Sequence, residues 1–263
     1  MIIAWFSCGA TSAVACKLAL NMYQDVRIVY IETGSAHPDN QRFIADCKKW
    51  YGQNIETISS PEYKNVEEVL LRRRYINGPF GAPCTYLLKK QVRISFEENV
   101  KNWDGQVFGF DFCEKEINRA IRFKQQNPKT KPLFPLIDKM ITKQDALAML
   151  QLAGIDIPVM YRIGYNNNNC IGCVKGGIGY WNKIRKDFPQ TFSRMAQIER
   201  IIHAACLKDN NGPMYLDELE PNRGNLNPII PDCSLFCSIE FQNLIDPQTK
   251  RVLSKTLSIN DCK

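Results

Sequence analysis

The first 22 residues constrain the fold most, because they join an apolar run to a helical pattern through a loop of small residues. Ile2–Phe6 is a short, wholly apolar run, typical of a buried strand. Residues 7–12 read SCGATS. Val14, Leu18 and Met22 then recur every four residues, which predicts a helix with these three side chains on its buried face. The chain therefore begins with a strand, a loop and a helix.

A loop of this kind is suited to binding an anion. Small residues let backbone N–H groups approach a phosphate, and the following helix adds the positive end of its dipole. The hydroxyls of Ser7, Thr11 and Ser12 are further donors or helix caps. The loop lacks the GxxxxGK[ST] sequence of Walker-type nucleotide-binding proteins. Many first loops of α/β domains bind nothing, so the loop alone leaves its function open.

The segments that follow alternate between strand and helix. Residues 26–31 predict a second strand that ends at Glu32, a helix begins at Asp39 or Asn40, and residues 54–58 predict a third strand. This order predicts a parallel sheet whose ligands lie at the carboxyl ends of the strands. We expect an α/β fold with a five-stranded, mainly parallel sheet flanked by helices.

The later segments predict further elements and a change of character. A fourth strand is expected at 106–110, and residues 127–135 are interpreted as a surface connection. Thr142 is the expected N-cap of a helix that runs to about Ala153. The division into domains is placed at 1–165 for the α/β domain and 166–263 for a helical, irregular and cysteine-bearing region that folds back onto it.

Composition limits the location and the cysteine chemistry. No apolar run approaches 18 residues, so no membrane span is expected. The first apolar run lacks the flanks of a signal peptide, which favours a cytoplasmic protein. In a reducing compartment the 11 cysteines are not expected to form disulfides, and metal, cluster or catalytic roles gain weight. The net charge of +7 permits a nucleotide or nucleic-acid ligand.

Cys170 and Cys173 form a CxxC pair after four consecutive asparagines. Two thiolates at this spacing bind one metal ion or cluster, although a redox dithiol and simple packing are alternatives. Three other cysteines lie in loop-like contexts and are candidates to complete the coordination: Cys84, Cys233 and Cys237. Four thiolates suit zinc and iron–sulfur equally, so the metal stays open.

Six motifs occur along the chain in a recognisable order. They are the loop at 7–12, Glu32-Thr33-Gly34 with His37-Pro38-Asp39, Cys84 before a helix with Lys89, Gly109 with Glu114 and Arg119, Pro135-Leu136-Ile137, and a run from Pro158 through Tyr161 and Gly164-Tyr165 to Cys170 and Cys173. The loop resembles the SGGxDS loop of the PP-loop, or adenine nucleotide alpha hydrolase, superfamily, with Cys8 at the second position and Thr11 replacing the aspartate. Together the motifs resemble the phosphoadenosine phosphosulfate (PAPS) reductase family over nearly the whole chain.

The resemblance implies an adenine nucleotide, ATP or a PAPS-like molecule, held between the loop and the end of the second strand. Glu32 is a candidate to bind Mg²⁺ or the nucleotide. The expected nucleotide-binding residues are Ser7, Cys8, Gly9, Ala10, Thr11, Ser12, Glu32, Thr33, Gly34, Gly109 and Arg119.

The resemblance also implies a 4Fe–4S cluster, which one branch of the family holds with a Cys-Cys pair and a CxxC pair. Thr85 replaces the second cysteine of the first pair, so Cys233 or Cys237 is expected as the fourth thiolate beside Cys84, Cys170 and Cys173. The nucleophilic cysteine of the reductases lies in an ECGxH-like motif, whose glycine and histidine are missing from residues 232–237. No catalytic residue is therefore assigned.

Two sulfur chemistries follow from the resemblance: reduction of a sulfonucleotide, or ATP-dependent sulfur transfer to an acceptor such as a nucleic acid. Either would involve a protein that donates electrons or sulfur. Two alternatives come from other classes of protein. One is a zinc-stabilised nucleic-acid-binding module that keeps the fold without catalysis, and the other is a dithiol oxidoreductase that uses Cys170 and Cys173.

Overall fold

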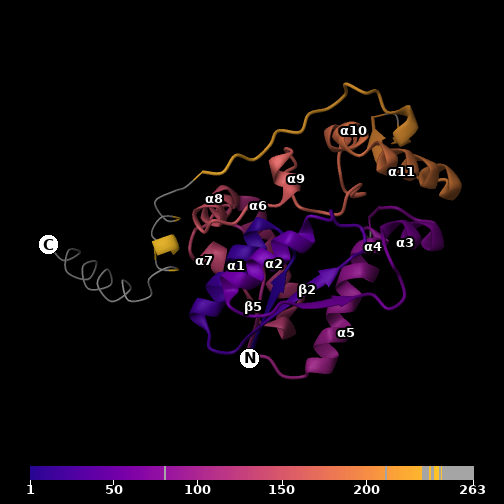
Figure 1. The fold of residues 1–263 in the computed structure, drawn as a ribbon. Coiled ribbons are helices and arrows are strands. Elements are labelled where there is room, and N and C mark those ends of the chain that lie inside the picture. The colour runs from indigo at the N-terminus through magenta and orange to yellow at the C-terminus, as the bar shows by residue number, and fades with distance from the viewer. Residues whose placement is uncertain (80, 211, 233–236, 238–239, 243, 245–263) are drawn as a thin grey trace.

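A computed structural model describes residues 1–79, 81–210, 212–232, 237, 240–242 and 244. Its centre is a five-stranded parallel sheet with the strand order β3-β2-β1-β4-β5 (Figure 1). The strands are β1 (Ile2–Phe6), β2 (Val26–Glu32), β3 (Glu56–Ser59), β4 (Gly105–Val107) and β5 (Pro132–Leu133). The expected α/β fold is confirmed.

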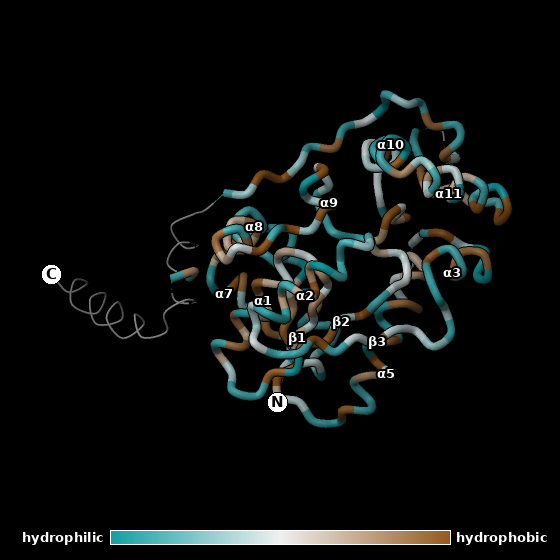
Figure 2. The backbone as a smooth tube through the Cα atoms, viewed as in Figure 1, coloured by the Kyte–Doolittle hydropathy of each residue, from teal (hydrophilic) through white to brown (hydrophobic). Residues whose placement is uncertain are grey.

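Helices cover both faces of the sheet, which explains why β1 is apolar along its whole length. Ala4 and Phe6 point to the face covered by α1, α2 and α8, whereas Ile3 and Trp5 point to the face covered by α5 and α6. These helices are α1 (Ala10–Met22), α2 (Asn40–Tyr51), α5 (Gln91–Val100), α6 (Glu114–Gln126) and α8 (Lys143–Leu152). Figure 2 shows the hydrophobic residues of β1 and β2 between these two layers of helices.

The remaining helices are short or lie beside the sheet. They are α3 (Val66–Arg73), α4 (Pro83–Thr85), η1 (Tyr86–Lys90), η2 (Pro128–Thr130), α7 (Pro135–Asp138), α9 (Val159–Arg162), α10 (Ile178–Asp187), α11 (Pro189–Ile202) and η3 (Leu216–Glu218). A two-stranded antiparallel hairpin, β6 (Leu207–Asp209) and β7 (Gly212–Met214), follows α11. Within the described residues, no helix is long and apolar enough to cross a membrane.

A second apolar cluster joins the C-terminal helices to the α/β part. Trp181 of α10 and Ile198 of α11, both fully buried, share it with Leu70 of α3 and Leu88 of η1. Figure 1 shows α3, α10 and α11 together on one side of the molecule, with α7 and α8 on the other. The C-terminal region thus packs against the α/β part, while the boundary at residue 165 stays a prediction.

Local sequence signals explain several of the element boundaries. Thr142 caps α8 as expected: its hydroxyl accepts a hydrogen bond from Asp145 N (3.2 Å), and the Asp145 carboxylate accepts one from Thr142 N (2.8 Å). Gly154 takes a positive φ of 70° after the helix, a conformation that glycine adopts without strain.

The interpretation of residues 127–135 as a surface connection is wrong, because the segment contains η2 and the edge strand β5. β5 has two residues, too few for a periodic signal, and Pro132 is tolerated in it because an edge strand has one unpaired side. Two further expectations differ from the structure. β4 ends at Val107 and not at Phe110, and Met22, expected on the buried face, is 43% exposed at the last turn of α1.

Candidate functional site

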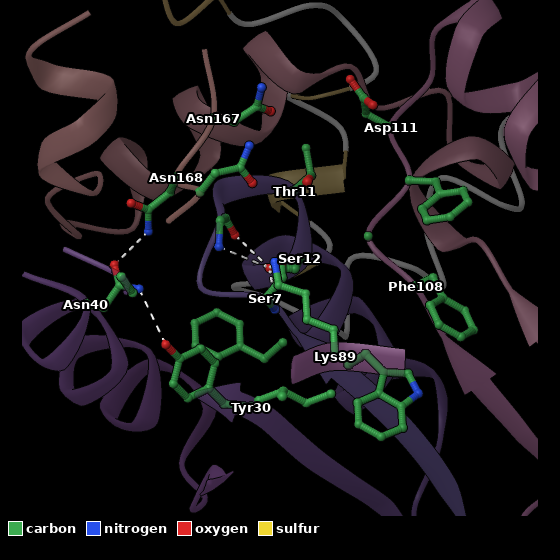
Figure 3. Close-up of a pocket in the computed structure, with 18 of the residues that line it drawn as sticks. Ser7, Thr11, Ser12, Tyr30, Asn40, Lys89, Phe108, Asp111, Asn167 and Asn168 are labelled. Atoms are coloured by element: carbon green, nitrogen blue, oxygen red, sulfur yellow. Dashed lines mark hydrogen bonds between the residues drawn. The ribbon is translucent and has the colours of Figure 1, made fainter. Parts of the chain in front are cut away.

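A pocket of about 400 Å³ opens at the carboxyl ends of β1, β2 and β4, the edge expected to bind ligands (Figure 3). Its wall also contains Asn167, Asn168 and Asn169, three of the four consecutive asparagines, which lie far from the loop in the sequence. The predicted nucleotide-binding residues that line the pocket are Ser7, Gly9, Thr11, Ser12, Thr33, Gly109 and Arg119. The structure therefore brings together residues from four separate segments.

Ser12 holds the loop in shape. Its hydroxyl oxygen accepts hydrogen bonds from Ser7 N (3.1 Å), from Gly9 N (3.2 Å) and from the Ser7 hydroxyl (3.0 Å), and donates one to Gly9 O (2.9 Å). The side chain is 2% exposed. A serine at the first turn of α1 thus closes the loop around the helix N-terminus, where an anion is stabilised.

Gly109 allows β4 to approach the loop. A Cβ atom at this position would lie 2.6 Å from Ser12 Cα and 2.7 Å from Ser12 N. These are backbone atoms, which cannot move aside as a flexible side chain can. The chain therefore leaves the sheet beside Ser12 only because residue 109 has no side chain, and this close approach forms one wall of the pocket.

Cys8 has the left-handed φ of 61°, a conformation that costs a non-glycine residue about 1 to 2 kcal/mol. This accounts for the glycine at the same position of the SGGxDS loop. The Cys8 side chain is fully buried, with its thiol 3.7 Å from Asn40 O. Burial, with smaller contributions from nearby groups such as Cys47, raises the pKa of the Cys8 thiol. Cys8 and the equally buried Ala10 support the loop from inside and do not line the pocket.

The asparagine run ties the loop to the second strand, a role that the sequence analysis missed. Asn168 Nδ2 donates hydrogen bonds to Cys8 O (2.5 Å) and Asn40 Oδ1 (2.8 Å), and Asn40 Nδ2 donates to the Tyr30 hydroxyl (3.5 Å). Figure 3 shows the last two bonds as dashed lines that join Asn168, Asn40 and Tyr30 in turn. The Asn168 Oδ1 atom is buried and has no partner among the described residues. The only sequence signal was the run of asparagines itself.

Three basic side chains line the pocket: Lys89, Arg119 and Lys143. Lys143 donates hydrogen bonds to Asn166 O (2.7 Å) and Asn167 Oδ1 (2.6 Å), and burial lowers the pKa of its amine. Arg119 is paired with Glu116 (3.0 Å) and lies over the Phe110 ring. Asp111 and Glu116 line the pocket as well, but the first turn of α1 contains no acidic residue, so the loop end of the pocket is suited to phosphate groups.

Glu32 and Gly34 lie next to the pocket but do not line it. The Glu32 carboxylate accepts hydrogen bonds from Thr33 N (2.7 Å), Gly34 N (2.8 Å) and the Tyr30 hydroxyl (3.0 Å). Gly34 has a φ of 67°, and a Cβ there would lie 1.8 Å from Lys64 O. Both residues shape the turn after β2, so the structure gives them a local structural role in place of direct contact with the pocket.

Three of the predicted metal-binding cysteines line one small cavity beside the pocket: Cys84, Cys170 and Cys173. Cys84 lies at the start of α4, and the other two lie on the loop before α10. Burial raises the pKa of the Cys84 and Cys173 thiols, and each thiol is also near at least one other cysteine. Lys89 and Lys175 line the same cavity, so the thiols face positive charge.

The CxxC loop is held rigidly. The Tyr180 hydroxyl accepts a hydrogen bond from Cys173 N (2.9 Å) and donates one to Cys170 O (3.2 Å). Gly172, between the two cysteines, has a φ of 72° and lies against Thr191 and Trp181. The two sulfur atoms are thus presented from a turn that is held by hydrogen bonds, at the end of the pocket.

Of the two cysteines expected to supply a fourth thiolate, Cys237 lies away from Cys84, Cys170 and Cys173. Cys237 is fully buried in the apolar cluster of α1, α2 and α8, and its thiol donates to Asp145 O (3.6 Å). Cys84 and Cys170 contact the other cluster, beside α3 and α10. The reason is that the segment after residue 220 runs back across the molecule to α8 (Figure 1). Cys233 lies outside the described residues.

The arrangement of the thiols limits which metal group they could hold. Within the described parts of the chain, no three His, Cys, Asp or Glu side chains are grouped as one metal ion requires. A single zinc ion needs sulfur atoms roughly 3.8 Å apart. A 4Fe–4S cluster takes its thiolates on separate irons, so its ligands surround a larger space. Thiols from two segments line this one cavity, which is the donor chemistry that zinc and iron–sulfur clusters share.

A family model described as the phosphoadenosine phosphosulfate reductase domain matches residues 1–176. No curated protein matches the chain. Among solved structures, the chain is similar to the PAPS reductase from Candida auris in a phosphate complex, with a TM-score of 0.46, 11% identity, and coverage of 64% of this chain and 80% of that chain. Because the family model covers more than half of the residues, the chain belongs to the phosphoadenosine phosphosulfate reductase family.

Proposed function

We propose that the protein binds an adenine nucleotide, ATP or a PAPS-like molecule, in the pocket above β1, β2 and β4, and acts on sulfur beside an iron–sulfur cluster held by its cysteines. Membership of the family supports sulfur-related nucleotide chemistry. The contacts in the pocket support binding of the phosphates on the loop at residues 7–12. The position of the cysteines supports sulfur chemistry at the neighbouring cavity.

The phosphates of the nucleotide would lie on the loop at residues 7–12. Its backbone N–H groups and the dipole of α1 favour negative charge, and Lys89 and Lys143 add positive charge at the wall. Thr11 offers a hydroxyl where the PP-loop pattern has an acid.

One observation carries the proposal: the pocket and the cysteine cavity share a wall. The residues that line both are Thr33, Lys89, Asn169 and Cys170. A nucleotide whose phosphates lie on the loop would therefore direct the group at the end of its phosphate chain toward Cys170. A protein that only binds nucleotides does not need thiols at that place.

The thiols of Cys84, Cys170 and Cys173 would hold the cluster, with Lys89 and Lys175 offsetting the charge of the thiolates. When bound, such a cluster supplies electrons or a place where sulfur is held. The Thr33 hydroxyl and the Cys173 N–H group orient the sulfur atoms and the turn that bears them. A protein that donates electrons or sulfur, and a nucleic-acid acceptor, remain predictions.

Calorimetric titration of the full-length protein with ATP, adenylyl sulfate and PAPS tests the binding step. We expect one of them to bind at one site per chain, and Ser12→Ala to lower its affinity at least ~10-fold, because Ser12 closes the loop. Ser95→Ala, an exposed serine on α5, is the matched control and should change nothing. Absence of binding by all three nucleotides would overturn the proposal.

The product identifies which sulfur chemistry occurs. Release of sulfite from a sulfonucleotide would show reduction. Formation of AMP and pyrophosphate from ATP, dependent on a sulfur acceptor, would show sulfur transfer. A protein that binds nucleic acid in a salt-dependent manner, contains one zinc and no sulfide, and turns over no nucleotide would be the zinc-stabilised module.

A further inference from the structure

Tyr161 of α9 reaches the loop at residues 7–12 from a distant part of the chain. Its side chain is 7% exposed and lines the pocket together with Gly9. The Tyr161 hydroxyl oxygen accepts a hydrogen bond from Ala10 N (3.4 Å), the first N–H group of α1. A Cβ atom at Gly9 would lie 3.2 Å from the same oxygen, so the hydroxyl lies directly against the backbone of the loop. Tyr161 therefore places a hydroxyl at the helix N-terminus, where an anion is stabilised.

The short helix that carries Tyr161 is fastened to α2. Val159 N donates a hydrogen bond to the Asp39 carboxylate (2.8 Å), and Arg42 donates one to Asp156 O (2.9 Å). Asp39 and Arg42 are also paired with each other (2.7 Å). These contacts hold α9 in place without using the Tyr161 hydroxyl, so the phenol has its position before a ligand binds, and little freedom is lost on binding.

The Tyr161 hydroxyl is a hydrogen-bond donor at neutral pH. Burial raises the pKa of Tyr161 to about 12, and backbone hydrogen bonds with Ala10 and Asn168 offset this only in part. A phenol accepts hydrogen bonds with its oxygen and has one hydrogen to donate. Because backbone groups bond to the oxygen, the hydrogen can be donated to a ligand in the pocket. A negatively charged oxygen, such as that of a phosphate, forms the strongest bond with such a donor.

We propose that Tyr161 is a binding residue of the pocket, whose hydroxyl donates a hydrogen bond to the phosphate group that lies on the loop. This rests on the proposed function only in that a phosphate group binds at residues 7–12. The bound phosphate would then join α9 to the start of α1. A hydroxyl that merely occupied the Ala10 N–H group would instead compete with the phosphate, and its removal would raise the affinity.

The test compares Tyr161→Phe with Tyr51→Phe in the full-length protein. Both tyrosines are buried, and each hydroxyl bonds to the backbone of α1, since Tyr51 donates to Ala13 O (2.9 Å). Tyr51 does not line the described pocket, so Tyr51→Phe is the matched control. Calorimetry measures binding of ATP, adenylyl sulfate, PAPS and inorganic pyrophosphate, and urea unfolding measures the stability of each variant.

We expect Tyr161→Phe to lower the affinity for pyrophosphate, and for the nucleotide that binds, at least ~10-fold, because a hydrogen bond to a charged oxygen is lost. Tyr51→Phe should lower the midpoint of urea unfolding but change these affinities less than ~2-fold.

An unchanged or higher affinity in Tyr161→Phe would overturn this inference and leave the nucleotide site standing. Pyrophosphate binding that Tyr161→Phe weakens, in a protein that binds none of the three nucleotides, would support the role of the hydroxyl and overturn the proposed nucleotide. If the unchanged protein binds neither the nucleotides nor pyrophosphate, both proposals fail.

Discussion

The Thr33 hydroxyl lies 3.1 Å from the Cys170 sulfur, in the wall that the pocket above β1, β2 and β4 shares with the cysteine cavity. Thr33 is 5% exposed, at the end of β2, and it lines both spaces. In a metal-bound protein such a hydroxyl would donate to the thiolate and tune it. Under the proposed function, the contact would give a bound nucleotide a short path by which to affect the cysteine thiols.

Replacing Thr33 by valine tests this contact. Valine keeps the shape but cannot donate, so metal content should be unchanged while the visible or electron paramagnetic resonance spectrum of the cluster shifts. Iron analysis and the spectrum measure the two effects. Thr85→Val, at an exposed position on the same cavity, is the control and should leave the spectrum as it is. An identical spectrum in both variants would show that the Thr33 contact has no influence on the sulfur.

Gly109→Ala should damage the pocket and the fold together. The added Cβ would lie 2.6 Å from Ser12 Cα, so β4 or the loop must move. We expect the free energy of unfolding to fall by roughly 1 to 3 kcal/mol and nucleotide affinity to fall at least ~10-fold. Urea denaturation and calorimetry measure these changes. Gly177→Ala, where a Cβ meets nothing within 4 Å, should be near neutral, and equal effects in the two variants would argue against the close approach.

Cys8 offers a test of backbone strain that separates conformation from burial. Cys8→Gly and Cys8→Ala both remove the buried thiol, but only glycine adopts a φ of 61° without strain. We expect the glycine variant to be more stable than the alanine variant by roughly 1 kcal/mol. Denaturant unfolding of both proteins measures the difference. Greater stability of the alanine variant would mean that the loop does not need the left-handed conformation.

Asn168→Ala should loosen the loop, because it leaves Cys8 O and Asn40 Oδ1 without their buried donor. An unsatisfied buried polar group costs roughly 1 to 3 kcal/mol, and the free energy of unfolding should fall by that amount. The exposed Asn102→Ala is the control and should change it by less than about 0.5 kcal/mol. Unfolding by urea distinguishes them, and a neutral Asn168→Ala would refute the structural role of the run.

Asp39 gives the protein a pH dependence of known sign. Hydrogen bonds from Arg42 (2.7 and 2.8 Å), with a further one from Val159 N, hold the pKa of this carboxyl below its usual value of 3.8. A lowered pKa means that the stabilisation is present at neutral pH and is lost as the pH falls through the pKa of the folded state. Asp39→Asn should therefore be less stable than the unchanged protein at pH 7, by about 1.5 to 3 kcal/mol.

The stability gap between Asp39→Asn and the unchanged protein should narrow when urea unfolding is repeated at decreasing pH toward pH 3. The exposed Glu98→Gln should show no such gap at any pH. A gap that is constant with pH would mean that the ion pair with Arg42 does not carry the effect.

Much of the fold could be predicted because its signals are local. The strand–loop–helix at the N-terminus, the alternation of strands and helices, and the Thr142 cap each depend on neighbouring residues. The family resemblance rested on motifs in a fixed order, and the match to the family model confirms it. β5 escaped prediction because two residues have no period, and its partner β4 is distant in the sequence.

The site was harder to predict, because its contacts span the chain. The motifs suggested the loop, Thr33 and Gly109, which do line the pocket, but they also suggested Glu32, whose carboxylate turns to its own backbone. The side-chain amide of Asn168 donates to Cys8 O, which lies 160 residues earlier in the sequence, and no local sequence pattern predicts such a contact. The same applies to Cys237, because only the path of the chain after residue 220 shows which cluster it joins.

The most direct test of the account is a nucleotide titration of the protein, purified without oxygen and followed by its visible spectrum. We predict ~4 iron and ~4 sulfide per chain, and a change in the cluster absorption that saturates at one nucleotide per chain and is lost in Ser12→Ala. One zinc without sulfide, no metal at all, or a cluster whose spectrum ignores a bound nucleotide would contradict the claim that pocket and sulfur site work together.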